Sequence, residues 1–239
     1  MIYKIAKLLF IFLIISQPIF ASELLDYKIT IWGVKVADVS IERNDTIFNG
    51  IEASSIKYYA NNYNISGLIF PVNNFYHVII NKKSYQTLYF FKDTFQPGLK
   101  NNIETVAKDG VVKYKEKQFI IPKESMNIFA LLDYIAKKGI TELLLSPFVI
   151  EREGNLYRGL IKKSEKNNSE YFLNIDDSID SLKLNQIIEN TDIFTWVIFK
   201  ENVDRIIYLD FERSLINKCI FNYGFISVIA TLKEYHNVY

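Results

Sequence analysis

Residues 23–42, ELLDYKITIWGVKVADVSIE, constrain the fold more than any other part of the chain. Every second residue from Tyr27 to Ile31 is apolar, which is the period of a β-strand with one face in a core. Gly33 permits a tight turn, and the alternation that follows slips by one residue at Val36-Ala37. A slip of one residue exposes the apolar face unless a β-bulge absorbs it. We therefore predict a hairpin, tight at Trp32-Gly33 and bulged near Ala37, in a sheet that curves.

Strand-like alternation recurs along most of the chain. We expect further strands at 51–60, 75–81, 85–92, 103–107, 111–115, 149–152, 157–162, 171–175, 193–200, 205–211 and 225–232. Asp109-Gly110 is the strongest short turn signal, since this dipeptide favours the tight turns of hairpins. Residues 181–188 fit a helix or a strand. Strands at both ends of the chain predict one large antiparallel sheet that curls towards a barrel.

One segment has the period of a helix instead. Its apolar residues are spaced at i, i+3, i+4 and i+7: Ile128, Leu131, Leu132 and Ile135. Ser125 is placed to cap the start, and Lys137-Lys138-Gly139 is typical of an end. The predicted fold is therefore mainly β: a single antiparallel, strongly curved or barrel-like sheet with one inserted helix at about residues 125–138.

The N-terminus is typical of an export signal. Lys4 and Lys7 precede the apolar run 8–15, and Ala21 offers a small residue at a cleavage point. An uncleaved membrane anchor is the alternative, but this run is far shorter than the ~20 residues of a spanning helix. We expect residues 1–21 to be a signal peptide and 22–239 a single β-rich domain without a transmembrane span. The only Cys is Cys219, so no lipid-modified Cys follows the run, and the expected location is the periplasm.

The hairpin also carries a resemblance to a known family. Residues 32–37, WGVKVA, after an exported N-terminus and a Tyr-containing strand, resemble the opening of exported bacterial proteins of domain of unknown function 3108. Residues 195–205 and 224–232 resemble the family's later strands. The family usually has a second Gly at the position of Ala37 and often Pro at that of Ile207. The resemblance implies a fold and a compartment, and no activity.

Charge and cysteine content exclude some classes of function. The chain has 28 Lys and Arg against 27 Asp and Glu, and its short basic runs are scattered. Nucleic acid is therefore not expected as a partner, since binding to phosphates needs clustered basic residues. A single Cys cannot form an internal disulfide, so the stability of the fold must come from burial of apolar side chains.

Catalytic and metal-binding patterns are scarce in the sequence. Of two His, His236 is close to the C-terminus, and His77 lies in an apolar strand, where a partly buried, hydrogen-bonded role is the plain interpretation. The acidic group around 176–180 (Asp176, Asp177, Asp180) lacks the spacing of a calcium loop. Glu151 and Glu153 share a strand face, which suits solubility at a hairpin mouth. We predict a protein that is not an enzyme, with no metal and no cofactor.

Aromatic residues are the remaining signal. The chain has 18 Phe and 16 Tyr, dense between 58 and 95, and these fill either a thick core or the walls of an apolar cavity. On the second interpretation, the concave face binds an apolar ligand such as a lipid or acyl chain. The candidate wall residues are Phe75, Ile79, Tyr89, Phe91, Trp196 and Ile198. The alternative is a protein-interaction or structural module of the cell envelope, acting through the apolar segment 68–70 or an unpaired edge strand.

Overall fold

The computed structural model describes residues 22–62, 71–138, 147–176 and 190–238, together with residues 141, 144 and 187. The described residues form a sheet of 14 strands and two α-helices. The strands are β1 (Ser22–Ile31), β2 (Val34–Phe48), β3 (Ile51–Asn61), β4 (Asn73–Asn81), β5 (Thr87–Gln96), β6 (Leu99–Lys108), β7 (Val111–Lys113), β8 (Gln118–Ile120), β9 (Phe148–Arg152), β10 (Asn155–Lys163), β11 (Glu170–Asp176), β12 (Asp204–Asp210), β13 (Leu215–Tyr223) and β14 (Ile226–Val238). The helices are α3 (Ile128–Lys138) and α4 (Ile193–Phe199).

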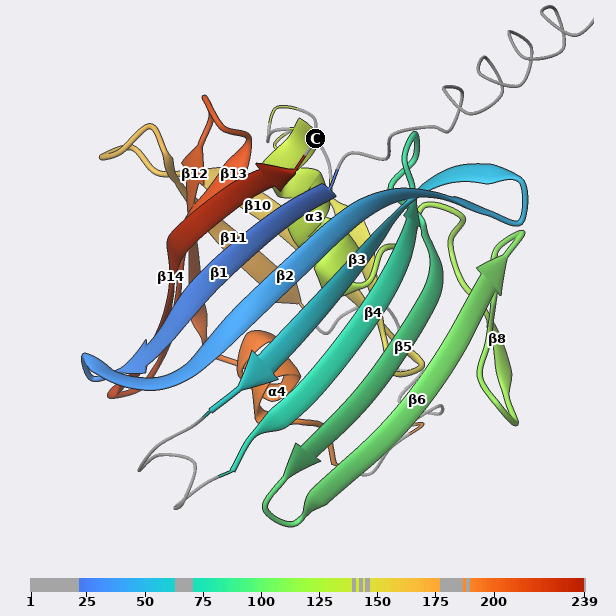
Figure 1. Cartoon of the computed structure of the whole chain (residues 1–239), viewed down its shortest axis with the longest axis horizontal. Helices are drawn as coiled ribbons and strands as arrows, with labels where there is room; N and C mark the ends of the chain where they lie inside the picture. The colour runs from blue at the N-terminus through green and yellow to red at the C-terminus, as the bar shows by residue number, and fades with distance from the viewer. Residues whose placement is uncertain are drawn as a thin grey trace, which may run out of the picture.

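The sheet is antiparallel throughout and strongly curved (Figure 1). Strands that follow one another in sequence pair as neighbours, and β1 pairs with β14, so the two ends of the described chain meet in the middle of the sheet. The edge strands β8 and β9 do not pair with each other. A single parallel bridge between Met126 and Ile150 links the segment after β8 to β9. The predicted fold class is confirmed: one curved, barrel-like sheet that is not closed.

The first hairpin has the predicted form. Trp32 and Gly33 occupy its turn with φ of 50° and 78°, a left-handed conformation that Gly adopts without strain. The register of β1 on β2 shifts between Ile29 and Thr30, which leaves Val36 as an extra residue in β2. A bulge of this kind bends the strand and increases its twist, so it contributes to the curvature of the sheet.

Helix α3 confirms the predicted helix with a later start. It begins at Ile128 and ends at Lys138, and its N-terminus is capped by Asn127 in place of Ser125. The Asn127 side-chain oxygen accepts a hydrogen bond of 2.8 Å from the Ala130 amide. The helix lies inside the curve of the sheet, where it contacts β4, β9 and β13 (Figure 1).

Helix α4 corrects a prediction, because residues 193–200 were expected to form a strand. A mostly apolar run, interrupted here by Thr195, is consistent with either a buried strand or a buried helix. The local determinant is Asp192, whose carboxylate accepts a 2.9 Å hydrogen bond from the Thr195 amide and caps the helix. Side chains of α4 are then buried against β13 inside the same curve.

Candidate functional site

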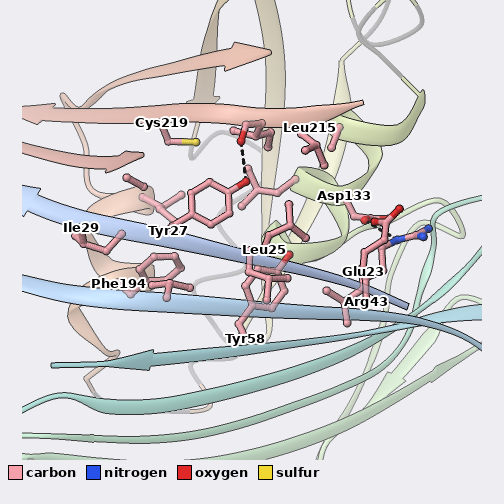
Figure 2. A pocket seen from close by; sticks show the side chains of 18 of the residues that line it. Glu23, Leu25, Tyr27, Ile29, Arg43, Tyr58, Asp133, Phe194, Leu215 and Cys219 are labelled. Atoms are coloured by element: carbon pink, nitrogen blue, oxygen red, sulfur yellow. Dashed lines mark hydrogen bonds and ion pairs between the residues drawn. The ribbon is translucent and has the colours of Figure 1, made fainter. Parts of the chain in front are cut away.

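The concave side of the sheet holds a partly open cavity of about 100 Å³ between the two helices and strands β1, β2, β3, β13 and β14 (Figure 2). Most of its lining residues are apolar. They include Leu25, Tyr27, Ile29, Val39, Phe194 and Ile198. Small-molecule sites are usually concave and apolar with a few polar groups. This cavity has that character, so we take it as the candidate site.

Strand β1 gives the cavity its long axis. Leu25, Tyr27 and Ile29 alternate inward and are buried, while Glu23 follows the same face to the end of the strand. At about 3.3 Å per residue, the span from Glu23 to Ile29 is roughly 20 Å. The alternating side chains of β1, identified from the sequence, therefore form one wall of the cavity. This wall is charged at one end and apolar at the other.

The charged end consists of four side chains that pair with one another (Figure 2). Arg43 Nε donates to Asp133 Oδ1 at 3.0 Å, and Arg43 Nη2 donates to Ser54 Oγ at 3.1 Å. Lys137 Nζ lies 2.8 Å from Glu23 Oε1 and 2.7 Å from Glu23 Oε2. Burial raises the pKa of Asp133, although the charges of Arg43 and Lys137 oppose that shift.

The opposite end of the cavity holds no ionised group among the described lining residues. Tyr27 donates its hydroxyl to the Ile216 carbonyl at 2.7 Å. Burial raises the pKa of the Cys219 thiol to about 12, so this thiol is protonated at neutral pH. Cys219 is thus a buried free thiol, and it serves as part of an apolar wall.

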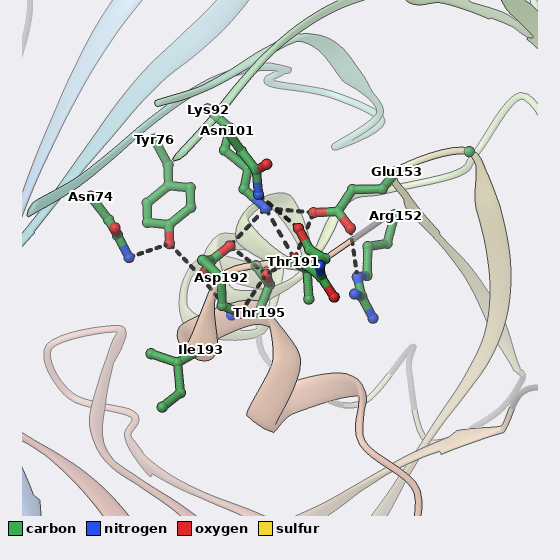
Figure 3. A network of polar contacts seen from close by, with 12 residues as sticks. Asn74, Tyr76, Lys92, Asn101, Arg152, Glu153, Thr191, Asp192, Ile193 and Thr195 are labelled. Atoms are coloured by element: carbon green, nitrogen blue, oxygen red, sulfur yellow. Dashed lines mark hydrogen bonds and ion pairs between the residues drawn. The ribbon is translucent and has the colours of Figure 1, made fainter. Parts of the chain in front are cut away.

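A buried polar network fixes helix α4 against the sheet (Figure 3). The ammonium of Lys92 is fully buried, 2.5 Å from Glu153 Oε1 and 2.7 Å from Asp192 Oδ2. Tyr76 donates its hydroxyl to Asp192 Oδ1 at 2.7 Å. Strands β4 and β5 and the β9–β10 turn thereby hold the start of α4. Because Phe194 and Ile198 are on this helix, the network sets the position of the cavity wall.

Asp192 both caps helix α4 and pairs with Lys92. Burial alone raises its pKa, but the charge of Lys92 and hydrogen bonds from Lys92 and Thr195 outweigh burial and hold the pKa below its usual value. The sequence analysis missed both Lys92 and Asp192. The sequence did contain one signal, which is that Lys92 alternates with Phe90 and so shares its strand face. The structure shows that this face is buried.

Four of the six predicted wall residues lie on the outer face of the sheet. In β4 the buried side chains that face the helices include Tyr76, Val78 and Ile80, so the alternate residues point outward. The outward set consists of Phe75, Ile79, Tyr89 and Phe91. The Phe75 and Phe91 rings are 6.0 Å apart in this partly buried outer cluster. None of these four residues lines the cavity.

The two predicted residues of α4 have different positions. Ile198 is buried and lines the cavity. Trp196 is 40% exposed on another side of the helix, and its ring meets Tyr223 edge-on with centroids 6.0 Å apart. Two residues that are two positions apart point to different sides of a helix, whereas in the expected strand they would have shared one face.

Glu151 and Glu153 also correct a prediction, since both are buried and neither is a surface group. Glu151 accepts from the Tyr114 hydroxyl and, at 2.9 Å, from the Gly154 amide. Glu153 pairs with Lys92. Each carboxylate has its own partners, so the two do not form a shared acid pair.

His77 has the plain role that the sequence suggested. Its Nε2 lies 2.8 Å from Ser55 Oγ on the outer face, and burial together with the charge of Lys57 lowers its pKa. In the middle of a sheet the backbone amides pair with neighbouring strands, so the amides of β3 and β4 beside this Ser–His pair are not free to bind an oxyanion.

The acidic group that was considered as a metal site lies mostly outside the described residues. Asp177 and Asp180 lie outside the described residues, as does the apolar segment 68–70. Within the described ranges, no group of three or more His, Cys, Asp or Glu side chains has the geometry of a metal site. In those same ranges, no helix is both long enough and apolar enough to cross a membrane.

Comparisons with known proteins support the fold and do not identify a family or a function. No family model and no curated protein matches this chain. A similar solved structure is the crystal structure of a β-barrel-like protein of domain of unknown function DUF1849 from Brucella abortus. The two share 8% sequence identity with a TM-score of 0.51, over 92% of this chain and 98% of that chain. At this identity the likeness shows a β-barrel-like fold alone.

Proposed function

We propose that this protein is an exported envelope protein of the periplasm that binds an apolar ligand, such as a lipid or acyl chain, inside its curved sheet without catalysing a reaction. The observation that carries this proposal is the apolar cavity of about 100 Å³ with charged residues at one end. That arrangement suits an amphiphile, whose tail would lie along β1 and whose head would meet Arg43 and Asp133.

The size of the cavity limits the tail. An engineered cavity of about 150 Å³ in another protein is dry and binds benzene, so about 100 Å³ holds a short alkyl segment. Each buried methylene contributes about 0.8 kcal/mol. A longer tail requires side chains of the wall, such as Phe194, to change position.

The compartment and the family complete the proposal. Lys4, Lys7 and the apolar run 8–15 support export. A β-barrel-like fold is consistent with a distant relationship to the exported proteins of domain of unknown function 3108, on the residues given above. We assign no chemical step, because the charged groups around the cavity pair with one another and Cys219 is protonated.

Native mass spectrometry of protein from its own host, followed by organic extraction, tests this function. We expect a near-stoichiometric apolar compound. Val39→Phe, which adds a ring inside the cavity, should abolish its retention. Val106→Phe is the matched control, because Val106 lies on the outer face and is exposed. A ligand-free protein whose melting temperature no lipid shifts would show that the cavity is only a packing defect.

A protein-interaction role is the second candidate, favoured by two exposed rings. Trp32 and Phe225 are 66% and 82% exposed, and they stack at 6.2 Å at the tips of adjacent hairpins. Larger contiguous exposed apolar patches often mark interaction sites, and this role would make the stacked pair part of one. Co-purification of a stoichiometric protein that is lost in Trp32→Ser would favour this role. Absence of such a partner from both wild type and variant would argue against it.

A further inference from the structure

We infer that the ligand of the cavity is a single-chain amphiphile whose head donates hydrogen bonds, an alcohol or an amine, and that Asp133 receives them. This inference rests on the proposed function and specifies its ligand. Asp133 lines the charged end of the cavity and is only 8% exposed. Its Oδ2 atom is buried, and in the described part of the chain it has no hydrogen-bond partner.

Among the described residues at this end, the buried atom of Asp133 that lacks a hydrogen-bond partner is an acceptor. Arg43 Nε is committed to Asp133 Oδ1, and Lys137 spans both oxygens of Glu23. A carboxylate can accept at two oxygens with about four lone-pair sites, so Asp133 retains most of its capacity. A buried acceptor without a donor is unfavourable, and a ligand hydroxyl or ammonium group removes that cost.

Charge disfavours the commonest alternative, a fatty-acid anion. A ligand carboxylate at this end would approach the carboxylates of Asp133 and Glu23, while the two nearby cations already pair with those groups. Like charges at close range repel strongly where the surroundings are partly buried. A head that donates fits the same space without displacing either ion pair.

The cavity also orients such a ligand. Asp133, Arg43 and Glu23 gather at one end, and Ile29 and Phe194 lie at the other (Figure 2). A head bound at Asp133 directs its tail along β1 towards Phe194. The orientation follows from the separation of polar and apolar lining, which β1 shows along its length from Glu23 to Ile29.

Three probes with the same alkyl chain test the inference: octanol, octylamine and octanoate, each titrated into the delipidated mature protein by calorimetry at neutral pH. We expect the alcohol and the amine to bind at least about tenfold more tightly than the carboxylate. In Asp133→Asn, which keeps the shape and removes the negative charge beside Arg43, octanoate should gain affinity and the ranking should reverse. Asp210→Asn breaks another Asp–Arg pair, with Arg213, away from the cavity, and should leave the ranking unchanged.

The outcomes separate the inference from the function. Tighter binding of octanoate by wild type overturns the donor-head inference and leaves apolar-ligand binding intact. Failure of all three probes to bind overturns the proposed function as well. A ranking in Asp133→Asn that equals wild type shows that Asp133 does not receive the head. If Asp133→Asn does not fold, the wild-type ranking alone decides the inference.

Discussion

Replacing Lys92 by Met should destabilise the protein through the carboxylates it leaves behind. The Lys92 ammonium is fully buried between Glu153 and Asp192. Met preserves much of the side-chain volume and removes the charge. The variant therefore keeps two buried carboxylates without the cation that compensates them, and it loosens the start of α4.

The structure sets the size of the effect. Removing one partner of a buried ion pair typically costs 3–5 kcal/mol. Glu153 keeps Arg152, whose Nε is 3.3 Å from Glu153 Oε2, so the lower end of that range, about 3 kcal/mol, is expected for the free energy of unfolding. For a domain of this size that loss lowers the melting temperature by roughly 6–12 °C.

Urea and thermal unfolding followed by circular dichroism measure this loss. Lys82→Met is the matched control, because Lys82 pairs with Asp45 at 2.8 Å on the surface and should cost less than about 1 kcal/mol. The double variant Lys92→Met with Asp192→Asn should recover part of the loss, since Asn removes a buried charge and still caps α4. A cost for Lys92→Met no larger than that of the control would refute the reasoning.

Two further predictions concern packing and pH. Gly159→Ala should destabilise the protein by about 1–3 kcal/mol, because a Cβ there would lie 2.1 Å from the Phe148 ring; an unchanged urea midpoint would contradict this. The pKa of Asp192 is lowered from 3.8 by Lys92 against the effect of burial, so its contribution to stability is full above pH 3.8 and is lost as the pH falls through the folded-state value. The stability difference between wild type and Asp192→Asn should therefore shrink on acidification, and a constant difference in urea titrations would exclude the charge effect.

The Asp192 prediction also shows where the sequence analysis fell short. Asp192 precedes an apolar run with Thr195 three residues on, a helix-start pattern that was readable from the chain. Residues 193–199 themselves have no polar face, so their pattern fitted a buried strand as well as a buried helix. Tertiary packing against β13 completed the choice in favour of α4.

Local periodicity by itself determined the elements that alternate clearly. The first hairpin, its bulge at Val36 and the stripe of α3 all follow from residues close in sequence, because side-chain direction repeats every two residues in a strand and about every 3.6 in a helix. The single curved antiparallel sheet followed from the number and order of these elements.

Only the tertiary structure decided which face of each strand is inside. Strand β4 is apolar on both faces, so Tyr76 and Phe75 were equivalent in the sequence, and the curvature of the sheet around α3 turned Tyr76 inward. The charged end of the cavity likewise joins Arg43 on β2 to Asp133 on α3, residues far apart along the chain. Alternation is a local property, whereas burial and pairing across such distances depend on how the whole sheet closes around the helices.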